Sequence, residues 1–477
     1  MVSPSAAIPL VVDIDGTLVA TDTLWELVAA YLKKHPVAIL QLVAWVFAGK
    51  AQFKARLVSA VTLEVDTLPY RQEFLEWLRE EKRGGRRLLL ASGADQRVAD
   101  AIADHLGFFE RVLASDGIKN ATGSVKADMI EAAIGPHYEY AGNSMVDLAV
   151  WRRCGSAVVV APYDGVLPAL DRHNIHIVRL FAAPKLTWKI WSKAIRTHQW
   201  VKNVLVFLPL IAGHRVLDPA AVGASILAFL AFGFTASAGY LVNDLFDLTL
   251  DRRHSTKRRR PLSAGLISIP QSIAAIFILV TAAVAISAFL PWNASLLLLG
   301  YLLATLTYSF FLKKMLLADV VFLALFYTVR VLYGGSATGI EISLWLLAFS
   351  VFSFFSLGAV KRINDLAKME STGSEKLERR AYRSEDRQAL VPQAAATANI
   401  AVLVLILYLN STQVTTLYRH PRVLWVTIPP LLYWFNRIIA LGNRGTLPDD
   451  PILFGAKDAA TYAVVAVLGL TVLAAIL

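Results

Sequence analysis

Two aspartates, Asp13 and Asp15, directly follow a short apolar stretch near the start of the chain, in the sequence DIDGT. In such a pair, one carboxylate can attack a phosphorus atom while the other moves the proton of the leaving group. Phosphoryl transfer needs little else besides positive charge on the phosphate oxygens. The spacing therefore indicates a phosphoryl-transfer site at the end of a strand.

Three further polar residues follow in an order that fits the same chemistry. Ser92 ends the next strand-like run, Lys126 lies in the sequence GSVKADM, and Asp147 closes the sequence GNSMVD. Together with DIDGT, these residues resemble the four motifs of the haloacid dehalogenase-like phosphatase superfamily, over roughly residues 8–175. The resemblance implies a Rossmann-like α/β fold with a small helical cap.

The resemblance also implies a role for each of these side chains. Asp13 would be the nucleophile that forms an aspartyl phosphate, and Asp15 would be the general acid and base. Ser92 would donate a hydrogen bond to a phosphate oxygen, and Lys126 would neutralise its charge. Asp13, Asp15 and Asp147 would hold Mg²⁺.

One position departs from the usual pattern of that superfamily. Asn143 stands where an aspartate is usual, and an amide ligand lowers the negative charge around a bound metal ion. Because Asp13 and Asp15 are both present, the resemblance implies an active phosphatase. An inactive phosphatase fold that serves as a docking module stays the alternative.

A second group of acidic residues lies much later, at the end of a long apolar segment. The sequence NDLFDLTLD contains Asn243, Asp244, Asp247 and Asp251, and the spacing of four places three of them on one face of a helix. Such groups are unfavourable at membrane depth unless they bind a cation or line a cavity. Oxygen ligands grouped in this way suit Mg²⁺, which in turn suits a diphosphate.

A run of basic residues follows these acids immediately. The sequence HSTKRRRPLSAG contains Lys257 and Arg258, which we expect to bind phosphate groups because they follow the carboxylates so closely. About half of the run is expected only to orient the protein in the membrane, as basic cytoplasmic loops do.

The pattern NDxxDxxxD, the basic RPxxxG loop and about nine apolar segments resemble the UbiA superfamily of intramembrane prenyltransferases, over residues 190–477. Aromatic prenyltransferases of that superfamily usually carry a second aspartate-rich motif in the loop after the sixth helix. Here that loop reads KRINDL, beginning with Lys361 and Arg362. One acidic motif followed by this basic pair is similar to a different branch, the polyprenyl-phosphate (decaprenyl-phosphate) 5-phosphoribosyltransferases, which make precursors of cell-wall arabinan.

This resemblance implies transfer of 5-phosphoribose from 5-phosphoribosyl 1-diphosphate to a polyprenyl phosphate, with release of pyrophosphate. Mg²⁺ on the diphosphate would be held by Asn243, Asp244, Asp247 and Asp251, with Asp247 counted as catalytic. The phosphatase domain would then remove the 5-phosphate to give polyprenyl-phosphoryl-ribose. The residues expected to bind the two anionic substrates are Lys202, Asn203, Lys257, Arg258, Tyr308, Lys313, Lys361 and Arg362.

Two other functions stay open. The first is an aromatic prenyltransferase that consumes a prenyl diphosphate and carries a separate or inactive phosphatase domain. The second is a carrier or regulatory membrane protein with a degenerate enzyme fold. The basic KRINDL sequence argues against the first, and buried acids in a membrane argue against the second.

The composition sets the class of protein to which these sites belong. Of the 477 residues, 56% are hydrophobic and only 17% are charged, and the mean hydropathy of +0.53 is that of a membrane protein. The net charge is +11, but its basic residues cluster between apolar segments, so nucleic acid is not the expected partner. The single cysteine, Cys154, forms no internal disulfide.

Two domains are expected, residues 1–185 and residues 186–477. In the first, short apolar runs alternate with helical patterns, which predicts a parallel α/β sheet. Residues 23–75 interrupt this alternation with a helical cap, whose apolar run at 36–49 is too short to span a bilayer. We expect that run to be buried or to touch the membrane.

The second domain is expected to be all-α and to cross the membrane about nine times. Asp319 and Arg330 lie inside its fifth apolar segment, where we expect them to pair. The segments lie near 199–213, 220–243, 270–290, 292–311, 316–334, 342–362, 389–409, 421–441 and 453–477.

Basic residues concentrate in the loops on one side of these segments. This asymmetry predicts a multi-pass protein of the inner (cytoplasmic) membrane with its N-terminal domain in the cytoplasm. The expected partners are the bilayer, polyprenyl phosphate and 5-phosphoribosyl 1-diphosphate, with Mg²⁺ as cofactor. Whether the protein forms an oligomer stays open.

Overall fold

The structure is a computed structural model that describes residues 8–35, 38–312, 315–371, 381–448 and 451–477. The chain forms two compact units. The first comprises Met1–Ile195 and Tyr240–Ile276, and the second comprises Arg196–Gly239 and Phe277–Leu477. Residues 240–276 were expected in the membrane domain, yet they group with the first unit.

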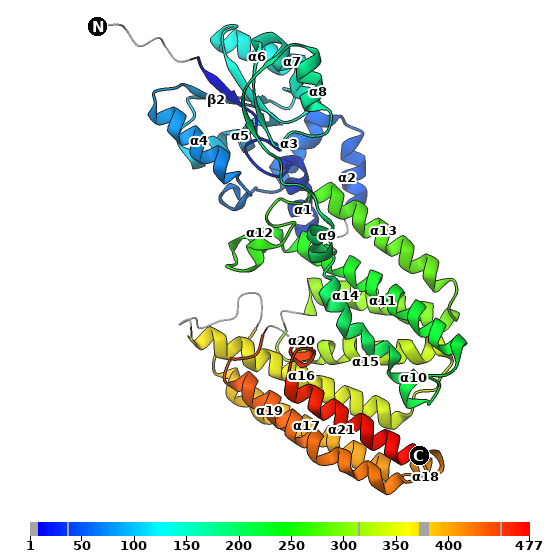
Figure 1. Ribbon diagram of the computed structural model, residues 1–477. Helices are drawn as coiled ribbons and strands as arrows, with labels where there is room; N and C mark the ends of the chain where they lie inside the picture. The colour runs from blue at the N-terminus through cyan, green and yellow to red at the C-terminus, as the bar shows by residue number, and fades with distance from the viewer. Residues whose placement is uncertain (1–7, 36–37, 313–314, 372–380, 449–450) are drawn as a thin grey trace. The chain divides into compact units, whose positions relative to one another are not determined.

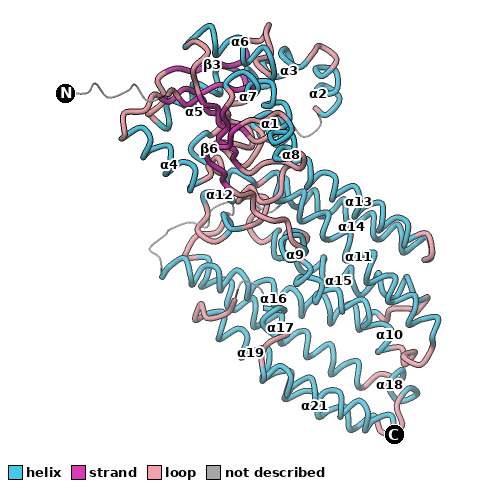
Figure 2. Tube along the Cα trace, turned by 45° about the horizontal axis from the view of Figure 1, so that its top comes forward, coloured by secondary structure: helices cyan, strands magenta, loops and turns pink. Residues whose placement is uncertain are grey.

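A parallel six-stranded sheet lies in the first unit (Figures 1 and 2). The strand order is β3-β2-β1-β4-β5-β6, so the direction of winding reverses at β1. Ligands of such sheets bind beyond the carboxyl ends of the strands at the point of reversal. The strands are β1 (Leu10–Val12), β2 (Leu88–Asp95), β3 (Arg111–Ser115), β4 (Glu139–Gly142), β5 (Ser156–Val160) and β6 (His176–Phe181).

Both faces of the sheet are buried. In β1, Leu10 and Val12 belong to one hydrophobic core and Val11 to another, because successive side chains of a strand point to opposite faces. Strands covered on both faces need near-continuous apolar sequence, and the runs LVV and LLLA supply it. The predicted parallel α/β fold is confirmed.

Helices cover the sheet on each side. Helices α4 (Gln72–Arg83) and α5 (Gln96–Leu106) pack in the core that contains Leu10. Helices α6 (Gly123–Ile134), α7 (Leu148–Cys154) and α8 (Val166–Arg172) pack in the core that contains Val11. The short helix η2 (Met145–Asp147) precedes α7, and α9 (Trp188–Ala194) follows β6.

The predicted helical cap consists of α1 (Thr23–Lys34), α2 (Ile39–Val46), α3 (Lys50–Ala60) and η1 (Val65–Thr67). Helix α2 covers the middle of the apolar run at 36–49, whose environment the sequence left open. Leu42 is buried, whereas Leu40 and Phe47 are 79% and 87% exposed. The run is therefore not buried as a whole, and its contact with a membrane stays a prediction.

Residues 240–276 contain the end of α11 (Pro219–Phe246), α12 (Leu248–Arg253), η4 (Lys257–Arg259) and the start of α13 (Ile269–Ser287). Among the described residues of the second unit, the named elements are all helices, joined by loops and turns (Figure 2). Its other elements are η3 (Thr197–Phe207), α10 (Leu208–Ala212), α14 (Trp292–Phe310), α15 (Ala318–Thr338), α16 (Leu344–Ser371), α17 (Asp386–Leu409), α18 (Thr412–Leu417), η6 (Pro421–Thr427), α19 (Ile428–Asn443), α20 (Pro451–Gly455) and α21 (Ala459–Ile476).

Seven helices within the described ranges are long and apolar enough to cross a membrane. They coincide with seven of the nine predicted segments, and the segment at 292–311 forms α14. The segment at 199–213 differs, because it forms η3 and α10 in place of one long helix. Pro209 lies at the start of α10, a position that favours proline because the missing N–H would have no helical partner.

Candidate active sites

The predicted phosphatase site lies where β1 ends. Asp13 directly follows β1, and its side chain is buried. The chain then turns, with Gly16 at a φ of +75°. The Thr23 backbone N–H, at the start of α1, donates to Asp15 Oδ1 at 2.7 Å. The turn and the helix start thus fix both predicted catalytic carboxylates.

A buried polar network joins three of the predicted residues. Lys126 Nζ, on α6, donates to Asp13 Oδ1 at 2.8 Å and to the Tyr140 hydroxyl at 2.7 Å. Tyr140 in turn donates to Asp147 Oδ1 at 2.8 Å. All four side chains are buried. The structure therefore places Asp13, Lys126 and Asp147 in one network, linked through Tyr140.

Both carboxylate oxygens of Asp147 accept hydrogen bonds. Oδ1 accepts from Tyr140, and Oδ2 accepts from the backbone N–H groups of Asn143 and Ser144 at 3.1 and 3.0 Å. The Ser144 hydroxyl also donates to Oδ2, at 2.9 Å. Asp147 thus organises the loop after β4, and its binding of Mg²⁺ stays a prediction.

Asn143 packs directly against the turn that follows the nucleophile. A Cβ atom added to Gly16 would lie 2.1 Å from Asn143 Nδ2, and this buried Nδ2 has no hydrogen-bond partner among the described residues. A half-turn of the amide places Oδ1 there instead. Mg²⁺ prefers oxygen ligands, so the Asp13 carboxylate and this amide oxygen fit the ion.

We predict that Gly16→Ala abolishes phosphatase activity, because the new methyl group collides with Asn143 and strains the turn. The measurement is hydrolysis of a small phosphate monoester by the full chain. Gly107→Ala is the matched control, since Gly107 has a φ of +71° with nothing within 4 Å of an added Cβ. It bears only the backbone strain, of about 1–2 kcal/mol. Equal activity of the two variants would contradict the role given to the Asn143 contact.

Burial raises the pKa of both predicted catalytic aspartates, Asp13 and Asp15. It raises the pKa of Asp13 to about 6, although Lys126 opposes the shift. Burial, together with the carboxylates of Asp22 and Asp13, raises the pKa of Asp15 to about 8. A carboxyl group with that pKa keeps its proton at neutral pH, as a general acid must. Asp13 as nucleophile and Asp15 as general acid and base stay predictions, and the higher pKa of Asp15 favours it as the acid.

Ser92 lies in β2, the strand next to β1 in the sheet, and is fully buried. Its Oγ accepts a hydrogen bond from the Ala94 backbone N–H at 3.1 Å. The hydroxyl proton is therefore directed away from that amide. Donation of this proton to a phosphate oxygen stays a prediction.

The acidic motif lies where α11 gives way to α12. Asp247 separates the two helices, with φ and ψ of −96° and 7°. The backbone N–H groups of Asp247 and Asp251 still bond to the carbonyls four residues earlier, at 2.9 and 2.8 Å. The predicted helical spacing is therefore kept across the break. Asp244, Asp247 and Asp251 are all buried.

Arg260 bridges two of these carboxylates. Its Nη1 lies 3.0 Å from Asp244 Oδ1 and 2.5 Å from Asp251 Oδ2. The two carboxylates converge on one cationic group, so their oxygens also suit a divalent cation there. Within the described ranges, no three His, Cys, Asp or Glu side chains are grouped as a metal site. Binding of Mg²⁺ by Asn243, Asp244, Asp247 and Asp251 thus stays a prediction.

The two basic residues predicted to bind phosphate after this motif lie in η4. Lys257 is half-buried and Arg258 is exposed. The Arg258 backbone N–H bonds to the His254 carbonyl at 3.2 Å, which fixes the start of this turn. Phosphate binding by both side chains stays a prediction.

The second unit holds a separate group of buried cations and aromatic rings. Lys202 and Asn203 are buried in η3. Arg330 Nε, on α15, donates to Asn203 Oδ1 at 3.0 Å, and the guanidinium lies 4.7 Å from the centre of the Phe232 ring. Lys202 Nζ lies 5.8 Å from the centre of the Tyr327 ring. We call these five residues the cation–aromatic cluster.

Arg330 is buried among neutral partners in the described residues. Besides Asn203, its guanidinium donates to the Phe326 carbonyl and to the Tyr301 hydroxyl. A buried cation without a carboxylate partner is unfavourable. The cation–aromatic cluster therefore suits an anionic ligand.

The expected pairing of Asp319 with Arg330 is wrong. Asp319 accepts hydrogen bonds from Arg362 Nε and from the Tyr382 hydroxyl, both at 2.5 Å. Asp319 and Arg330 lie on the same helix α15, eleven positions apart, which is about 16 Å along the axis. That separation is too large for an ion pair within one helix.

Lys361 and Arg362 were expected at the start of a loop, and the structure places them inside a helix. Helix α16 continues to Ser371. Ile363, Leu366 and Met369 are buried at a spacing of three, so one helical face remains covered beyond the apolar segment. Hydropathy alone ends the segment too early because the charged residues interrupt it.

We predict that Arg362→Met strongly destabilises the second unit. Arg362 is 1% exposed and bonds to both Asp319 and Asp365, so its removal breaks the buried ion pair with Asp319. The expected loss is about 3–5 kcal/mol, seen as a lower unfolding temperature in detergent. Arg387→Met is the control, because the Arg387–Glu370 pair is about one-third exposed and contributes at most about 1 kcal/mol. Equal shifts for both variants would refute this role.

The remaining predicted substrate residues are less informative. Tyr308 is half-buried, and its ring packs edge-on against Phe326 with centroids 5.5 Å apart. Lys361 is half-buried. Lys313 lies outside the described residues. Substrate binding by these three residues stays a prediction.

Three residues at these sites were not among the predicted site residues. Tyr140 is the one hydroxyl-bearing side chain in the strand sequence EYAG. That hydroxyl in a short strand was an available signal of a polar contact. Arg260 was part of the basic run but was not distinguished from its neighbours. Arg330 stood out as a charge in an apolar segment, but its partner Asn203 lies too far away in sequence to be inferred.

Comparisons with known proteins identify the two parts of the chain. Residues 204–454 match the UbiA prenyltransferase family, and residues 10–152 match haloacid dehalogenase-like hydrolases. An uncharacterised protein of Sinorhizobium fredii, y4nM, is 34% identical over 95% of this chain and 88% of its own length.

Two further matches cover a smaller part of this chain. A decaprenyl-phosphate phosphoribosyltransferase of Mycobacterium tuberculosis is 37% identical, over 38% of this chain and 62% of its own length. A solved UbiA homologue from Archaeoglobus fulgidus, bound to DMAPP and Mg²⁺, is 16% identical over 59% of this chain and 98% of its own, with a TM-score of 0.46.

The sequence analysis predicted a UbiA-like membrane domain and a haloacid dehalogenase-like domain, and both are confirmed. The apolar helices and the family match together identify an integral membrane protein. The chain belongs to the UbiA prenyltransferase family and carries an N-terminal haloacid dehalogenase-like domain.

Proposed function

We propose that the chain is a bifunctional enzyme. Its membrane part transfers 5-phosphoribose from 5-phosphoribosyl 1-diphosphate to a polyprenyl phosphate, and its N-terminal domain removes the 5-phosphate from the product. The observation that carries this proposal is the buried Asp13–Lys126–Tyr140–Asp147 network, a phosphatase site in a chain whose other part is a UbiA transferase. Such a transfer creates the phosphate monoester that a phosphatase consumes.

The transfer joins an oxygen of the lipid phosphate to C1 of the ribose. The bond from C1 to the diphosphate oxygen breaks, and pyrophosphate leaves with the electron pair. The lipid phosphate is already ionised and needs no general base. The chain must therefore position two anions and offset their repulsion.

Positive charge for these anions is present in both units. The basic run supplies Lys257 and Arg258, and the cation–aromatic cluster supplies Lys202 and Arg330. We propose that Arg330 and Lys202 bind phosphate oxygens, because the acceptors of Arg330 are neutral.

Mg²⁺ is the proposed cofactor of both reactions. At the transferase it would be held by Asp244 and Asp251, whose oxygens already converge on Arg260, together with Asn243 and Asp247. At the phosphatase it would be held by Asp13 and Asn143, with Asp147 ordering that loop, while Asp15 keeps its proton for the transfer to O5. Bound Mg²⁺ supplies charge neutralisation for the diphosphate and the phosphate monoester.

Hydrolysis at the N-terminal domain takes two steps. An oxygen of Asp13 attacks the phosphorus, the bond to O5 of the ribose breaks, and Asp15 gives its proton to O5. Water then attacks the aspartyl phosphate while Asp15 accepts a proton, which releases phosphate and restores Asp13. Lys126 stabilises the negative charge throughout, since its ammonium group lies 2.8 Å from Asp13 Oδ1.

The choice of the phosphoribosyl branch rests on two features. Lys361 and Arg362 stand where an aromatic prenyltransferase usually has acids, and a phosphoribosyltransferase is 37% identical over part of the chain. We further propose that the protein lies in the cytoplasmic membrane with its N-terminal domain in the cytoplasm, because the basic loops share one side. The lipid product would serve as an arabinan-type cell-wall precursor.

The test uses purified full-length protein in detergent with polyprenyl phosphate, ribose-labelled 5-phosphoribosyl 1-diphosphate and Mg²⁺. We expect labelled lipid, and we expect chelation of Mg²⁺ to prevent its formation. A parallel reaction offers a prenyl diphosphate and an aromatic acceptor. Prenylation of that acceptor without labelled lipid would favour the aromatic prenyltransferase and overturn the proposal.

A further inference from the structure

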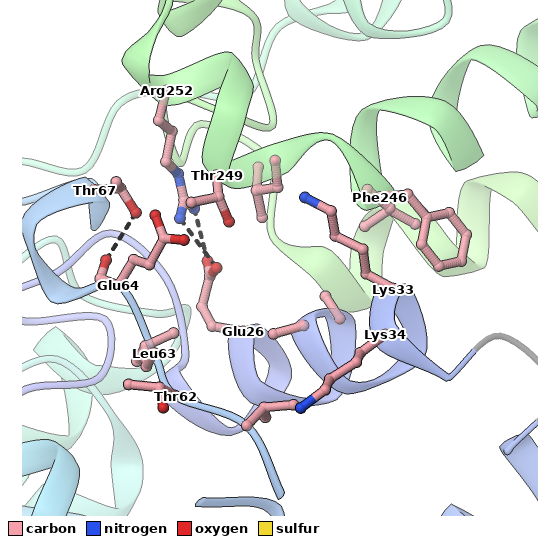
Figure 3. A pocket seen from close by; sticks show the side chains of 15 residues that line it. Glu26, Lys33, Lys34, Thr62, Leu63, Glu64, Thr67, Phe246, Thr249 and Arg252 are labelled. Carbon is pink, nitrogen blue, oxygen red and sulfur yellow. Dashed lines mark hydrogen bonds and ion pairs between the residues drawn. The ribbon is translucent and has the colours of Figure 1, made fainter. Parts of the chain in front are cut away.

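A buried ion pair, which takes no part in either proposed reaction, joins α1 of the cap to α12. Arg252 Nη2 donates to Glu26 Oε1 at 2.7 Å, and Nη1 donates to Oε2 at 3.0 Å (Figure 3). The two side chains are only 7% and 5% exposed. Two parallel bonds between an arginine and a carboxylate are the strong form of this interaction. Losing one partner leaves the other charge buried and uncompensated.

Glu26 is tied to the phosphatase turn. The Thr21 hydroxyl donates to Glu26 Oε1 at 2.7 Å, and the Gly16 backbone N–H donates to the Thr21 carbonyl at 3.0 Å. Two residues later, the Thr23 backbone N–H bonds to Asp15. The position of Glu26 is therefore coupled to the turn that holds the general acid.

Arg252 is tied to the acidic motif. It directly follows Asp251, and its Nε donates to the Ser263 carbonyl at 3.2 Å. In the same loop, Gly265 has a φ of +69°, and an added Cβ would lie 2.7 Å from the Ala20 carbonyl oxygen. The loop that follows the acidic motif thus meets the phosphatase turn at a second point.

Apolar contacts support this junction. Leu248, Leu262 and Ile269 form a buried cluster, against which Trp25 and Ala29 of α1 pack. A cavity of about 260 Å³ lies beside the ion pair, lined by α1, residues 61–64, Thr67, the end of α11 and α12 (Figure 3). The contact between α1 and α12 therefore combines charge, apolar packing and close backbone approach.

The neighbouring arginine offers a direct comparison. Arg253 Nη2 lies 2.9 Å from Glu64 Oε2 and 3.2 Å from Asp66 Oδ2, but these three side chains are about half exposed. Exposed ion pairs contribute little. Of these two adjacent arginines in α12, Arg252 thus makes a buried ion pair and Arg253 makes two exposed ion pairs with the same domain.

We propose that Glu26 and Arg252 form a clamp that holds the phosphatase turn and the acidic motif as one body. Both are positioning residues, and neither touches substrate. The clamp makes the phosphatase act on the lipid that the same chain has just produced. That consequence rests on the proposed function, whereas the clamp itself does not.

Hydrogen exchange on the full chain in detergent tests the clamp and needs no enzymatic turnover. We compare Glu26→Gln, Arg252→Met and the double variant, with Arg253→Met as control. Each single variant is expected to speed hydrogen exchange in α1 and α12 about tenfold. The double variant is expected to speed it no more than the single variant with the larger effect. Helix α5 and the control are expected to match wild type. The clamp would be overturned if α1 exchanged at the wild-type rate in Arg252→Met. It would also be overturned if the rate increase in the double variant equalled the product of the two single increases.

Coupling of the two reactions is tested in a single turnover with labelled phosphoribosyl diphosphate. In Arg252→Met, the ratio of phosphorylated to dephosphorylated lipid is expected to rise about tenfold, while hydrolysis of p-nitrophenyl phosphate stays at the wild-type rate. An unchanged lipid ratio, or equal loss on both phosphate esters, would overturn the positioning role. Absence of labelled lipid from wild type would refute the proposed function, and the exchange experiment would still decide the clamp.

Discussion

Replacing Asp13 by asparagine is expected to abolish hydrolysis of the 5-phosphate and to leave the transfer reaction intact. Asp13 is buried at the end of β1 with Lys126 Nζ at 2.8 Å, and an amide in its place cannot form the aspartyl phosphate. Loss of a nucleophile lowers turnover by at least about 10³-fold. Phosphorylated lipid should therefore accumulate, and the total rate of lipid labelling should equal that of wild type. The two lipids are distinguished by separating the labelled products with and without added phosphatase.

Asp95→Asn is the matched control for this variant. Asp95 is as buried as Asp13, at 6% exposure, and its side chain caps α5 by accepting from the Arg97 backbone N–H. Asparagine caps helices about as well as aspartate, so this variant should give wild-type products. If Asp13→Asn and wild type yield the same ratio of the two lipids, the N-terminal domain does not act on the transferase product.

Replacing Asp247 by asparagine is expected to lower lipid labelling by about 10²- to 10³-fold. Asp247 is buried at the break between α11 and α12, where it would contribute charge to the Mg²⁺ that the diphosphate requires. The amide keeps the size of the side chain but removes its charge. Hydrolysis of p-nitrophenyl phosphate should remain, because Asp13 and its partners are untouched.

The control for this second variant lies at the start of the same helix α11. Asp218 accepts hydrogen bonds from the backbone N–H groups of Ala220 and Ala221, a role that asparagine also fills. Asp218→Asn should therefore label lipid at the wild-type rate. Undiminished labelling in Asp247→Asn would show that the acidic motif is not part of the transferase.

The phosphatase residues could be predicted because strand ends converge. Asp13 and Ser92 follow or close apolar runs, and parallel strands bring such ends to one edge of a sheet. Lys126 was predicted from its motif and lies on the adjacent helix α6. Tyr140 was missed, because its hydroxyl in the strand sequence EYAG indicates a polar contact but does not identify Lys126 and Asp147 as the partners.

The membrane part was predicted less completely. Hydropathy located the long helices, but it ended α16 at Arg362 although buried residues continue to Met369. It also gave Asp319 the wrong partner, since Arg362 and Tyr382 approach from other parts of the chain. Such long-range contacts depend on packing between helices, which periodicity within one segment does not encode.

The central claim is that one chain makes and then dephosphorylates a lipid-linked phosphoribose. The most direct measurement is a time course of labelled lipids formed by wild-type protein from ribose-labelled 5-phosphoribosyl 1-diphosphate, polyprenyl phosphate and Mg²⁺. We predict that phosphorylated lipid appears first and declines as dephosphorylated lipid rises, with inorganic phosphate released in step. Phosphorylated lipid that only accumulates, or labelling that never reaches lipid, would contradict the account.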